Sequence, residues 1–191
     1  KIPSENSVLF APSWNYSKEN LFKNFGFILI DLLIKNKIKV IFRPHPEIIK
    51  RNKKQFESII KKYKCDKFFK LDLKPSNLES MQDSEVLITD NSTISIEYLF
   101  VIKRPVIFIN FKEKIHNAKF KDLNIEPFEE IVKKKFGYNL DISEISNIKK
   151  HFYNAKRTVI NLKSLSTFKK KNIYNLGSSA EFAEKFYKKI S

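Results

Sequence analysis

Glycine and cysteine are scarce in this 191-residue chain, which holds three glycines and a single cysteine, Cys65. The sequence has no glycine-rich dinucleotide fingerprint after its first apolar run, no Walker A motif and no Gly-x-Ser-x-Gly elbow, which argues against an oxidoreductase, a P-loop NTPase and an esterase. A lone cysteine excludes an intramolecular disulfide and leaves no cluster for a structural zinc ion. A reducing, cytoplasmic setting fits this composition.

Long apolar runs are also missing. The apolar run Phe25–Ile30 ends at Asp31. It is far shorter than the roughly 18 residues that a membrane span needs. The first residues show neither the basic nor the apolar region of a secretory signal. Because the chain starts at Lys1, we expect a piece of a longer protein with an N-terminal partner domain. At this length and 42% hydrophobic content, one domain covering residues 1–191 is expected.

Acidic residues are few relative to basic ones, which gives a net charge of +16. Such a charge is typical of proteins that bind nucleic acid or an anionic membrane. Nearly all the cations are lysines spread over the chain, and only four are arginines: Arg43, Arg51, Arg104 and Arg157. This dispersion favours a solvated basic surface over a dedicated nucleic-acid site, while an anionic membrane surface stays open as a partner.

Short apolar runs rich in β-branched and aromatic residues predict buried strands. Stretches with helical spacing separate them, and this alternation predicts a doubly wound α/β fold with a parallel sheet. The predicted strands are Val8–Phe10, Val40–Phe42, Phe68–Leu71, Val86–Thr89 and Val106–Ile109, and the helical stretches run from Leu21 to Leu33, from Phe56 to Tyr63 and from Ile94 to Leu99.

The pattern after Asn110 is less regular. Residues 112–124 predict a loop or partly helical connection, and residues 131–133 predict one more short strand. A capped helix is expected from Ser143 toward Lys156, and a closing helix over 180–190 with Ser178 or Ser179 as its N-cap.

The segment Arg43-Pro44-His45-Pro46 follows the second predicted strand. Ligands of open parallel sheets bind beyond the carboxyl ends of strands, so this loop is a candidate site. A guanidinium can pair two phosphate oxygens, and a histidine can donate a hydrogen bond or move a proton near neutral pH. The alternative is structural: Arg43 pairs with a carboxylate and His45 caps a turn.

The segment Asp90-Asn91-Ser92-Thr93 follows the fourth predicted strand and precedes a helix. Free backbone N–H groups, the helix dipole and two hydroxyls could bind a phosphoryl group there. These residue types are also ordinary N-caps, so a structural role is equally open. Glu97, one turn further on, could reach a ribose or polyol hydroxyl or stay solvated.

Weaker candidates lie at other positions of the chain. Ser13 and Trp14 follow the first predicted strand, and Asp72 follows the third. Gly177-Ser178-Ser179 at the start of the closing helix is a third possible anion site. His116 and His151 stand beside lysines and are predicted to be surface residues. Neither has a companion at metal-ligand spacing, so we expect no metal and no cofactor.

Three segments in order carry a family resemblance: Val8-Leu9-Phe10-Ala11-Pro12-Ser13-Trp14, Phe42-Arg43-Pro44-His45-Pro46, and Val86 through Glu97 with its Asp-Asn-Ser-Thr centre. Together they resemble the CDP-glycerol glycerophosphotransferases, the teichoic-acid primases and polymerases, and Lys103-Arg104-Pro105 extends the likeness. The resemblance implies a GT-B fold of two Rossmann-like halves, with this chain as the nucleotide-binding carboxyl-terminal half.

The resemblance also implies roles for individual residues. His45 corresponds to an essential histidine near the donor phosphates, Arg43 assists it, and Ser92 and Thr93 match a hydroxyl pair on the pyrophosphate. The family's other catalytic base belongs to the missing half, so this chain alone is expected to be inactive. Asn91, Thr93 and Glu97 stand where the family usually has Tyr, Ser and Asp, which leaves the donor open.

The expected function is transfer of glycerol-phosphate or a similar polyol-phosphate from a CDP-linked donor to a polymer or lipid-linked acceptor of the cell envelope, such as teichoic acid or capsule. The enzyme would work in the cytoplasm, at the inner face of the membrane. Two alternatives remain. One is a GT-B glycosyltransferase or UDP-GlcNAc 2-epimerase-like enzyme that uses a nucleotide sugar, and the other is a non-catalytic basic module that binds RNA or anionic lipid.

Overall fold

The computed structural model describes residues 2–14, 19–111, 119, 122 and 124–190. It divides into two compact units, Lys1–Val159 and Ile160–Ser191. The first unit contains the sheet and the candidate site residues except Ser178, and the second contains two helices.

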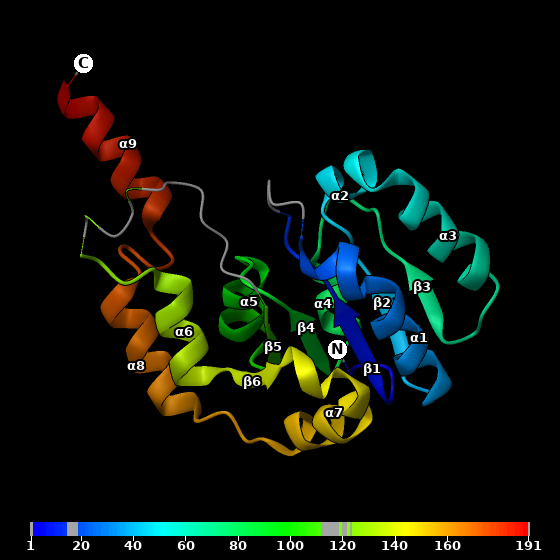
Figure 1. Ribbon diagram of the computed structural model, residues 1–191. Coiled ribbons are helices and arrows are strands. Elements are labelled where there is room, and N and C mark those ends of the chain that lie inside the picture. The colour runs from blue at the N-terminus through cyan, green and yellow to red at the C-terminus, as the bar shows by residue number, and fades with distance from the viewer. Residues whose placement is uncertain (1, 15–18, 112–118, 120–121, 123, 191) are drawn as a thin grey trace. The chain divides into compact units, whose positions relative to one another are not determined.

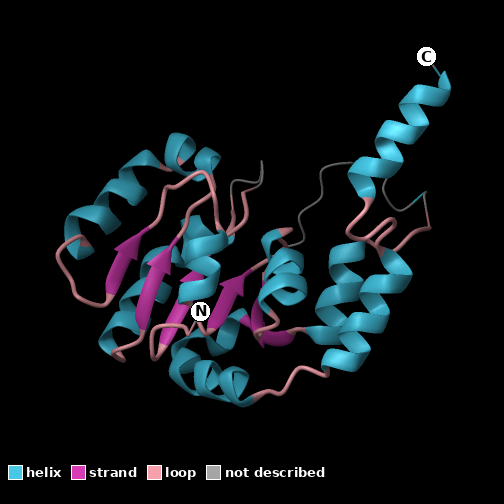
Figure 2. Cartoon of the chain, turned by 180° about the vertical axis from the view of Figure 1, so that it is seen from behind, coloured by secondary structure: helices cyan, strands magenta, loops and turns pink. Residues whose placement is uncertain are grey.

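The first unit is built on a six-stranded sheet in which every described pairing is parallel. The strand order is β3-β2-β1-β4-β5-β6, and the arrowheads that can be seen clearly in Figure 2 point the same way. This is the order of the doubly wound dinucleotide-binding fold, in which the chain reverses its direction of growth between β1 and β4. The strands are β1 (Ser7–Phe10), β2 (Lys39–Phe42), β3 (Phe69–Leu71), β4 (Val86–Thr89), β5 (Val106–Asn110) and β6 (Tyr138–Asp141).

Helical segments follow each of the first five strands, because parallel neighbours are joined by crossover connections that are usually helical. Figure 1 shows these helices around the sheet. They are η1 (Phe22–Gly26), α1 (Phe27–Lys35), α2 (Pro46–Arg51), α3 (Lys53–Tyr63), α4 (Leu78–Asp83), α5 (Ile94–Glu97), η2 (Tyr98–Ile102) and α6 (Phe128–Phe136), and after β6 come η4 (Ile142–Asn147) and α7 (Ile148–Arg157). The fold class, the five predicted strands and the helices predicted between them are confirmed.

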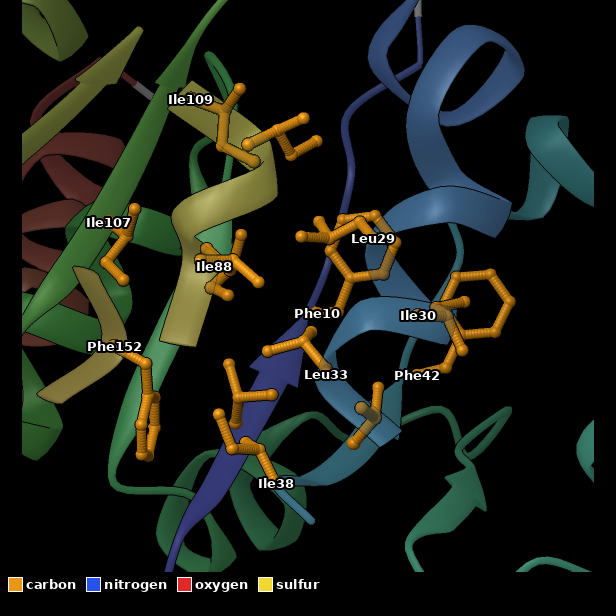
Figure 3. Packing of buried hydrophobic residues seen from close by; sticks show 14 of the residues in the cluster. Phe10, Leu29, Ile30, Leu33, Ile38, Phe42, Ile88, Ile107, Ile109 and Phe152 are labelled. Atoms are coloured by element: carbon orange, nitrogen blue, oxygen red, sulfur yellow. The ribbon is translucent and has the colours of Figure 1, made fainter. Parts of the chain in front are cut away.

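The core fills both faces of the sheet because alternate strand residues point to opposite sides. On one face Phe10, Phe42 and Ile88 belong to a cluster with residues of α1, α3 and α7, and Figure 3 shows Leu29, Leu33 and Phe152 packed over these strands. The intervening strand residues are fully buried as well, Leu9, Ile41 and Leu87 among them. Each large apolar side chain that is fully buried contributes about 1.5–3 kcal/mol to stability.

The predicted strand over residues 131–133 is wrong, because these residues lie inside α6. Glu129 and Glu130 occupy the first turn of α6 and lysines occupy its last turn, which matches the helix dipole at both ends. The sixth strand lies further on, at Tyr138–Asp141, and it was missed. Only Leu140 of that strand is buried, so its sequence lacks the apolar run that marks the inner strands.

Two further expectations need correction. The helix expected from Ser143 is a 3-10 turn, η4, that continues as α7, and Asp141 caps it by accepting a hydrogen bond from the backbone N–H of Ser143 at 2.9 Å. His151 is buried rather than exposed, and its Nδ1 lies 2.9 Å from the Tyr138 hydroxyl. The connection expected over 112–124 falls almost entirely outside the described residues, as does His116.

The second unit contains α8 (Leu162–Asn172) and α9 (Ser179–Ile190), which confirms the predicted closing helix. Ser178 and Ser179 both donate hydroxyl hydrogen bonds to the carbonyl of Asn175. None of the described residues of α9 is buried. No helix among the described residues is both long and apolar enough to cross a bilayer.

Gly137 allows the end of α6 to pass close to β5. A Cβ atom there would lie 2.5 Å from Cδ2 of Phe108 and 2.6 Å from the carbonyl oxygen of Lys133, and Phe108 is itself buried. We expect Gly137→Ala to lower the free energy of unfolding by about 1–3 kcal/mol through overpacking, measured by urea denaturation.

Gly177→Asn is the control for this substitution. Gly177 has a left-handed φ of +87° and open space around it, and asparagine tolerates that backbone region. It should change stability by less than about 0.5 kcal/mol. A similarly small loss for Gly137→Ala would contradict the close approach.

Candidate functional site at the carboxyl edge of the sheet

The candidate residues of the first unit gather at the carboxyl edge of the sheet because all its strands are parallel. Ser13 follows β1, Arg43 and His45 follow β2, Asp72 follows β3, and the segment from Asp90 follows β4. In folds of this strand order the ligand crevice opens between β1 and β4, where the connections diverge to opposite sides. The site is therefore centred on the ends of these two strands.

Asp90 joins the ends of β1 and β4. Its Oδ1 accepts a hydrogen bond from the backbone N–H of Ser13 at 2.7 Å, and its Oδ2 accepts one from the Ser13 hydroxyl at 2.8 Å. Ser13 is buried, so the pair fixes the backbone where the ligand crevice is expected. Both residues were predicted to bind phosphate. In the structure they bind each other and so connect β1 to β4, and their contact with a ligand stays a prediction.

Arg43 pairs with a carboxylate, as in the structural alternative. Its Nη1 lies 2.7 Å from Oδ2 of Asp72, and its Nη2 donates to the carbonyl of Pro75 at 3.3 Å. Asp72 is buried and also accepts hydrogen bonds from the Ser80 hydroxyl at 2.5 Å and the backbone N–H of Lys74 at 3.0 Å. Arg43 thus links the β2 loop to the β3 loop and keeps a cation at the sheet edge.

The surroundings of Asp72 set its charge. Burial by itself raises the pKa of the Asp72 carboxyl, but hydrogen bonds from Ser80, the Lys74 backbone and Arg43, together with the Arg43 charge, hold that pKa below its ordinary value of 3.8. Asp72 is therefore ionised at neutral pH and compensates Arg43.

His45 is the N-cap of α2. Its backbone is extended, with φ −60° and ψ 142°, as expected for a residue that precedes proline. Its Nδ1 accepts a hydrogen bond from the backbone N–H of Glu47 at 3.2 Å, so the neutral ring carries its proton on Nε2. The His45 ring is stacked on Trp14, with centroids 6.1 Å apart and planes 19° apart. The imidazole is exposed at the sheet edge with a defined tautomer.

Ser92 and Thr93 differ from the other candidates. Thr93 occupies the N-cap position of α5 but makes no side-chain capping hydrogen bond, and Ser92 uses only its backbone carbonyl, which accepts from the N–H and hydroxyl of Ser95 at 3.0 and 2.7 Å. Within the described residues, neither hydroxyl has a hydrogen-bond partner. The ordinary capping role does not account for these two hydroxyls.

The remaining predicted residues are engaged elsewhere. Asn91 donates from Nδ2 to Glu130 of α6 at 2.6 Å, and Glu97 accepts from Nδ2 of Asn77 at 2.7 Å, which ties α5 to the segment before α4. Ser178 lies in the second unit. Every predicted site residue except Ser178 thus lies in the segments that follow the carboxyl ends of β1, β2 and β4.

Four residues that hold the site had no role in the sequence-based prediction. Asp72 was noted only for its position after a strand, Trp14 for its position and as part of a family motif, and Ser80 and Glu47 were not noted. The signal for Asp72 was a carboxylate next to a strand end with an arginine after the neighbouring strand. No cluster of three or more potential metal ligands occurs in the part of the chain that the structure describes.

The sheet order and the site at its carboxyl edge define a Rossmann-like α/β domain. The family model for the CDP-glycerol:poly(glycerophosphate) glycerophosphotransferases matches residues 2–173. This chain belongs to that family, as its motifs predicted. No curated protein sequence matches the chain.

Two solved structures match parts of the chain. The UDP-GlcNAc 2-epimerase of Methanocaldococcus jannaschii, in complex with UDP-GlcNAc and UDP, has a TM-score of 0.53 and 18% identity over 80% of this chain and 39% of its own. The wall teichoic acid polymerase TagF has a TM-score of 0.49 and 16% identity over 89% of this chain and 39% of its own. The chain thus spans about two fifths of the length of these structures. The epimerase match supports the Rossmann-like half of a GT-B fold.

Asp72 makes the stability of the chain depend on pH. A carboxyl whose pKa is lowered by folding stabilises the protein above its unfolded pKa, and that contribution is lost as the pH falls through the folded value. We expect Asp72→Asn to cost about 2–4 kcal/mol at pH 7, because it leaves Arg43 without its countercharge.

The cost of Asp72→Asn should shrink as the pH falls below about 4, the ordinary range of an aspartate, which urea denaturation over pH 2–7 would show. The control is Glu57→Gln, which removes an exposed ion pair to Lys53 with a 3.9 Å separation and should have little effect at any pH. A cost for Asp72→Asn that stays constant with pH would contradict the role of the charge.

Proposed function

We propose that this chain binds the CDP-linked donor of a glycerophosphotransferase and supplies one half of its active centre. One observation carries the proposal. The hydroxyls of Ser92 and Thr93 lie at the carboxyl edge of the sheet and have no hydrogen-bond partner among the described residues. The family match supports the donor class. The pyrophosphate of the donor accepts hydrogen bonds from these hydroxyls and from nearby backbone N–H groups.

In the proposed reaction an acceptor hydroxyl attacks the β-phosphorus of the donor in line. The new P–O bond forms as the bond to CMP breaks, and a base of the other half takes the proton of the attacking hydroxyl. Reactions of this kind depend mainly on positioning and on compensation of phosphate charge. Nε2–H of His45 donates to a phosphate oxygen, and Arg43, held by Asp72, contributes positive charge.

In this proposal the chain binds the donor but cannot transfer its polyol-phosphate group, because the base and the acceptor site belong to the other half. The chain spans about two fifths of the solved structures it resembles, which supports a second half that supplies the base and the acceptor site. We therefore expect the 191-residue chain by itself to bind nucleotide and to show no transferase activity. The acceptor is a cell-envelope polymer or its lipid-linked precursor.

Location at the inner, anionic face of the membrane belongs to the same proposal. The +16 charge supports it, and so does α9, which exposes Phe182, Phe186 and Ile190 at a spacing of four residues and carries three lysines. Helices with this pattern are typical of membrane-surface binding. The partner is an anionic lipid surface rather than nucleic acid.

A nucleotide sugar is the second candidate for the donor. The fold similarity to an epimerase solved with UDP-GlcNAc and UDP favours it. The same sheet edge, with the same hydroxyl pair, could hold the diphosphate of either donor. The two candidates differ in the base and in the group beyond the β-phosphate.

Calorimetry with CDP-glycerol, CMP, UDP and UDP-GlcNAc separates these candidates. We expect CDP-glycerol to bind most tightly and UDP-GlcNAc to bind at least tenfold more weakly. Ser92→Ala, Thr93→Val and His45→Ala should each weaken CDP-glycerol about tenfold, since a hydrogen bond to a charged group contributes about 1.5–3 kcal/mol. Ser58→Ala is the matched control, because that hydroxyl donates only to Lys54 on α3.

Two results would contradict the proposal. Tighter binding of a uridine ligand would favour the nucleotide-sugar enzyme. An affinity that falls steeply with salt and survives His45→Ala would favour an electrostatic module for RNA or anionic lipid.

A further inference from the structure

His45, Glu47, Arg51 and Trp14 form a closed cycle of contacts, in which each residue contacts the next. Its Nδ1 accepts from the N–H of Glu47 at 3.2 Å, and the Glu47 carboxylate accepts from Nε of Arg51 at 3.0 Å. The Arg51 guanidinium lies 5.2 Å from the centroid of the Trp14 ring. Trp14 in turn stacks on His45, with centroids 6.1 Å apart. Each of the four residues in this cycle therefore contacts two of the others.

Trp14 is the member that fixes the plane of the imidazole. The hydrogen bond from Glu47 sets the tautomer of His45 but leaves the ring free to tilt about it. A nearly parallel stack at 19° removes that freedom, and stacked aromatic pairs contribute about 0.5–1.5 kcal/mol beyond their buried area. Removal of Trp14 would therefore leave the direction of Nε2 less restricted.

The position of Trp14 is held by its neighbour in sequence and by the core. Its neighbour Ser13 is bound through both N–H and hydroxyl to Asp90. The indole itself is half-buried and packs against the core of the first unit. The clamp between β1 and β4 is thereby connected to the histidine that follows β2.

We propose that Trp14 is a positioning residue for His45, which keeps Nε2 directed toward the donor phosphates, and that Arg51 holds Trp14 in place. The inference rests on the proposed donor-binding role of His45. Trp14 stacks on the histidine, so its effect on donor binding passes through His45. An indole that serves only as core packing would act on stability and independently of His45.

The first experiment observes the stack without any ligand. The 13C–1H spectrum of the chain at pH 8 reports the His45 Cε1–H resonance, assigned by its absence in His45→Ala. Ring current from Trp14 should shift this resonance upfield. We expect the shift to persist, reduced, in Trp14→Phe and to disappear in Trp14→Leu. A His45 resonance at the same position in wild type and Trp14→Leu would overturn the inference whatever the chain binds.

The second experiment is a double-mutant cycle on CDP-glycerol affinity. Trp14→Leu should weaken binding by about tenfold in the wild type, as expected when a reacting or binding group is misplaced, and by less than twofold in His45→Ala, because residues that act through one another are not additive. Trp14→Phe should retain most of the affinity. Equal losses in the two backgrounds would assign Trp14 to packing alone and overturn the inference.

Arg51 provides a matched pair of controls. Arg51→Met and Lys50→Met each remove one cation from Glu47, but only Arg51 lies over Trp14. We expect a change in the His45 resonance for Arg51→Met and none for Lys50→Met. If His45→Ala leaves CDP-glycerol affinity unchanged while the resonance still responds to Trp14→Leu, the proposed function fails and the stack stands.

Discussion

The contact between Asp90 and Ser13 is the constraint on which the site depends. One carboxylate accepts from both the backbone and the hydroxyl of a buried serine and so fixes the separation of β1 and β4 where the sheet changes direction. Ligands of this fold bind at that point, so its geometry has to be set before a ligand arrives. Ser92 and Thr93 follow Asp90 closely in sequence, and Trp14 follows Ser13, so the same contact places the two hydroxyls of the proposed donor site and the ring that stacks on His45.

Residues at the sheet edge fall into two groups. Some bind one another and hold the site together, and others are proposed to bind the donor. Asp72 holds Arg43, and Glu47 holds His45 through its backbone and Arg51 through its carboxylate. These contacts keep cations and a histidine in defined positions at the edge of an otherwise apolar sheet. Preorganised charge and donors of this kind stabilise phosphoryl transfer without reorganisation during the reaction.

The sequence predicted the fold because the four inner strands are continuous apolar runs, and helical spacing separates all five predicted strands. It missed β6, an edge strand with Leu140 as its one buried residue, and placed a strand where Val132 supplies the buried face of α6. Position after a strand identified Arg43, His45, Ser92 and Thr93. Their contacts could not be read in the same way, since Ser13–Asp90 and Arg43–Asp72 join residues 77 and 29 positions apart. Pairing across the sheet decides which polar groups are already bonded and which are left for a ligand.

The central claim is that the hydroxyls of Ser92 and Thr93, beside the β1–β4 junction, receive the donor pyrophosphate. A crystal structure of the chain soaked with CDP-glycerol tests it most directly. The account predicts phosphate oxygens within about 3 Å of both hydroxyls, the range of hydrogen bonds to charged acceptors, with Nε2 of His45 facing the β-phosphate and the Asp90–Ser13 contact intact. A pyrophosphate bound away from these hydroxyls, or a nucleotide that displaces Ser13 from Asp90, would contradict it.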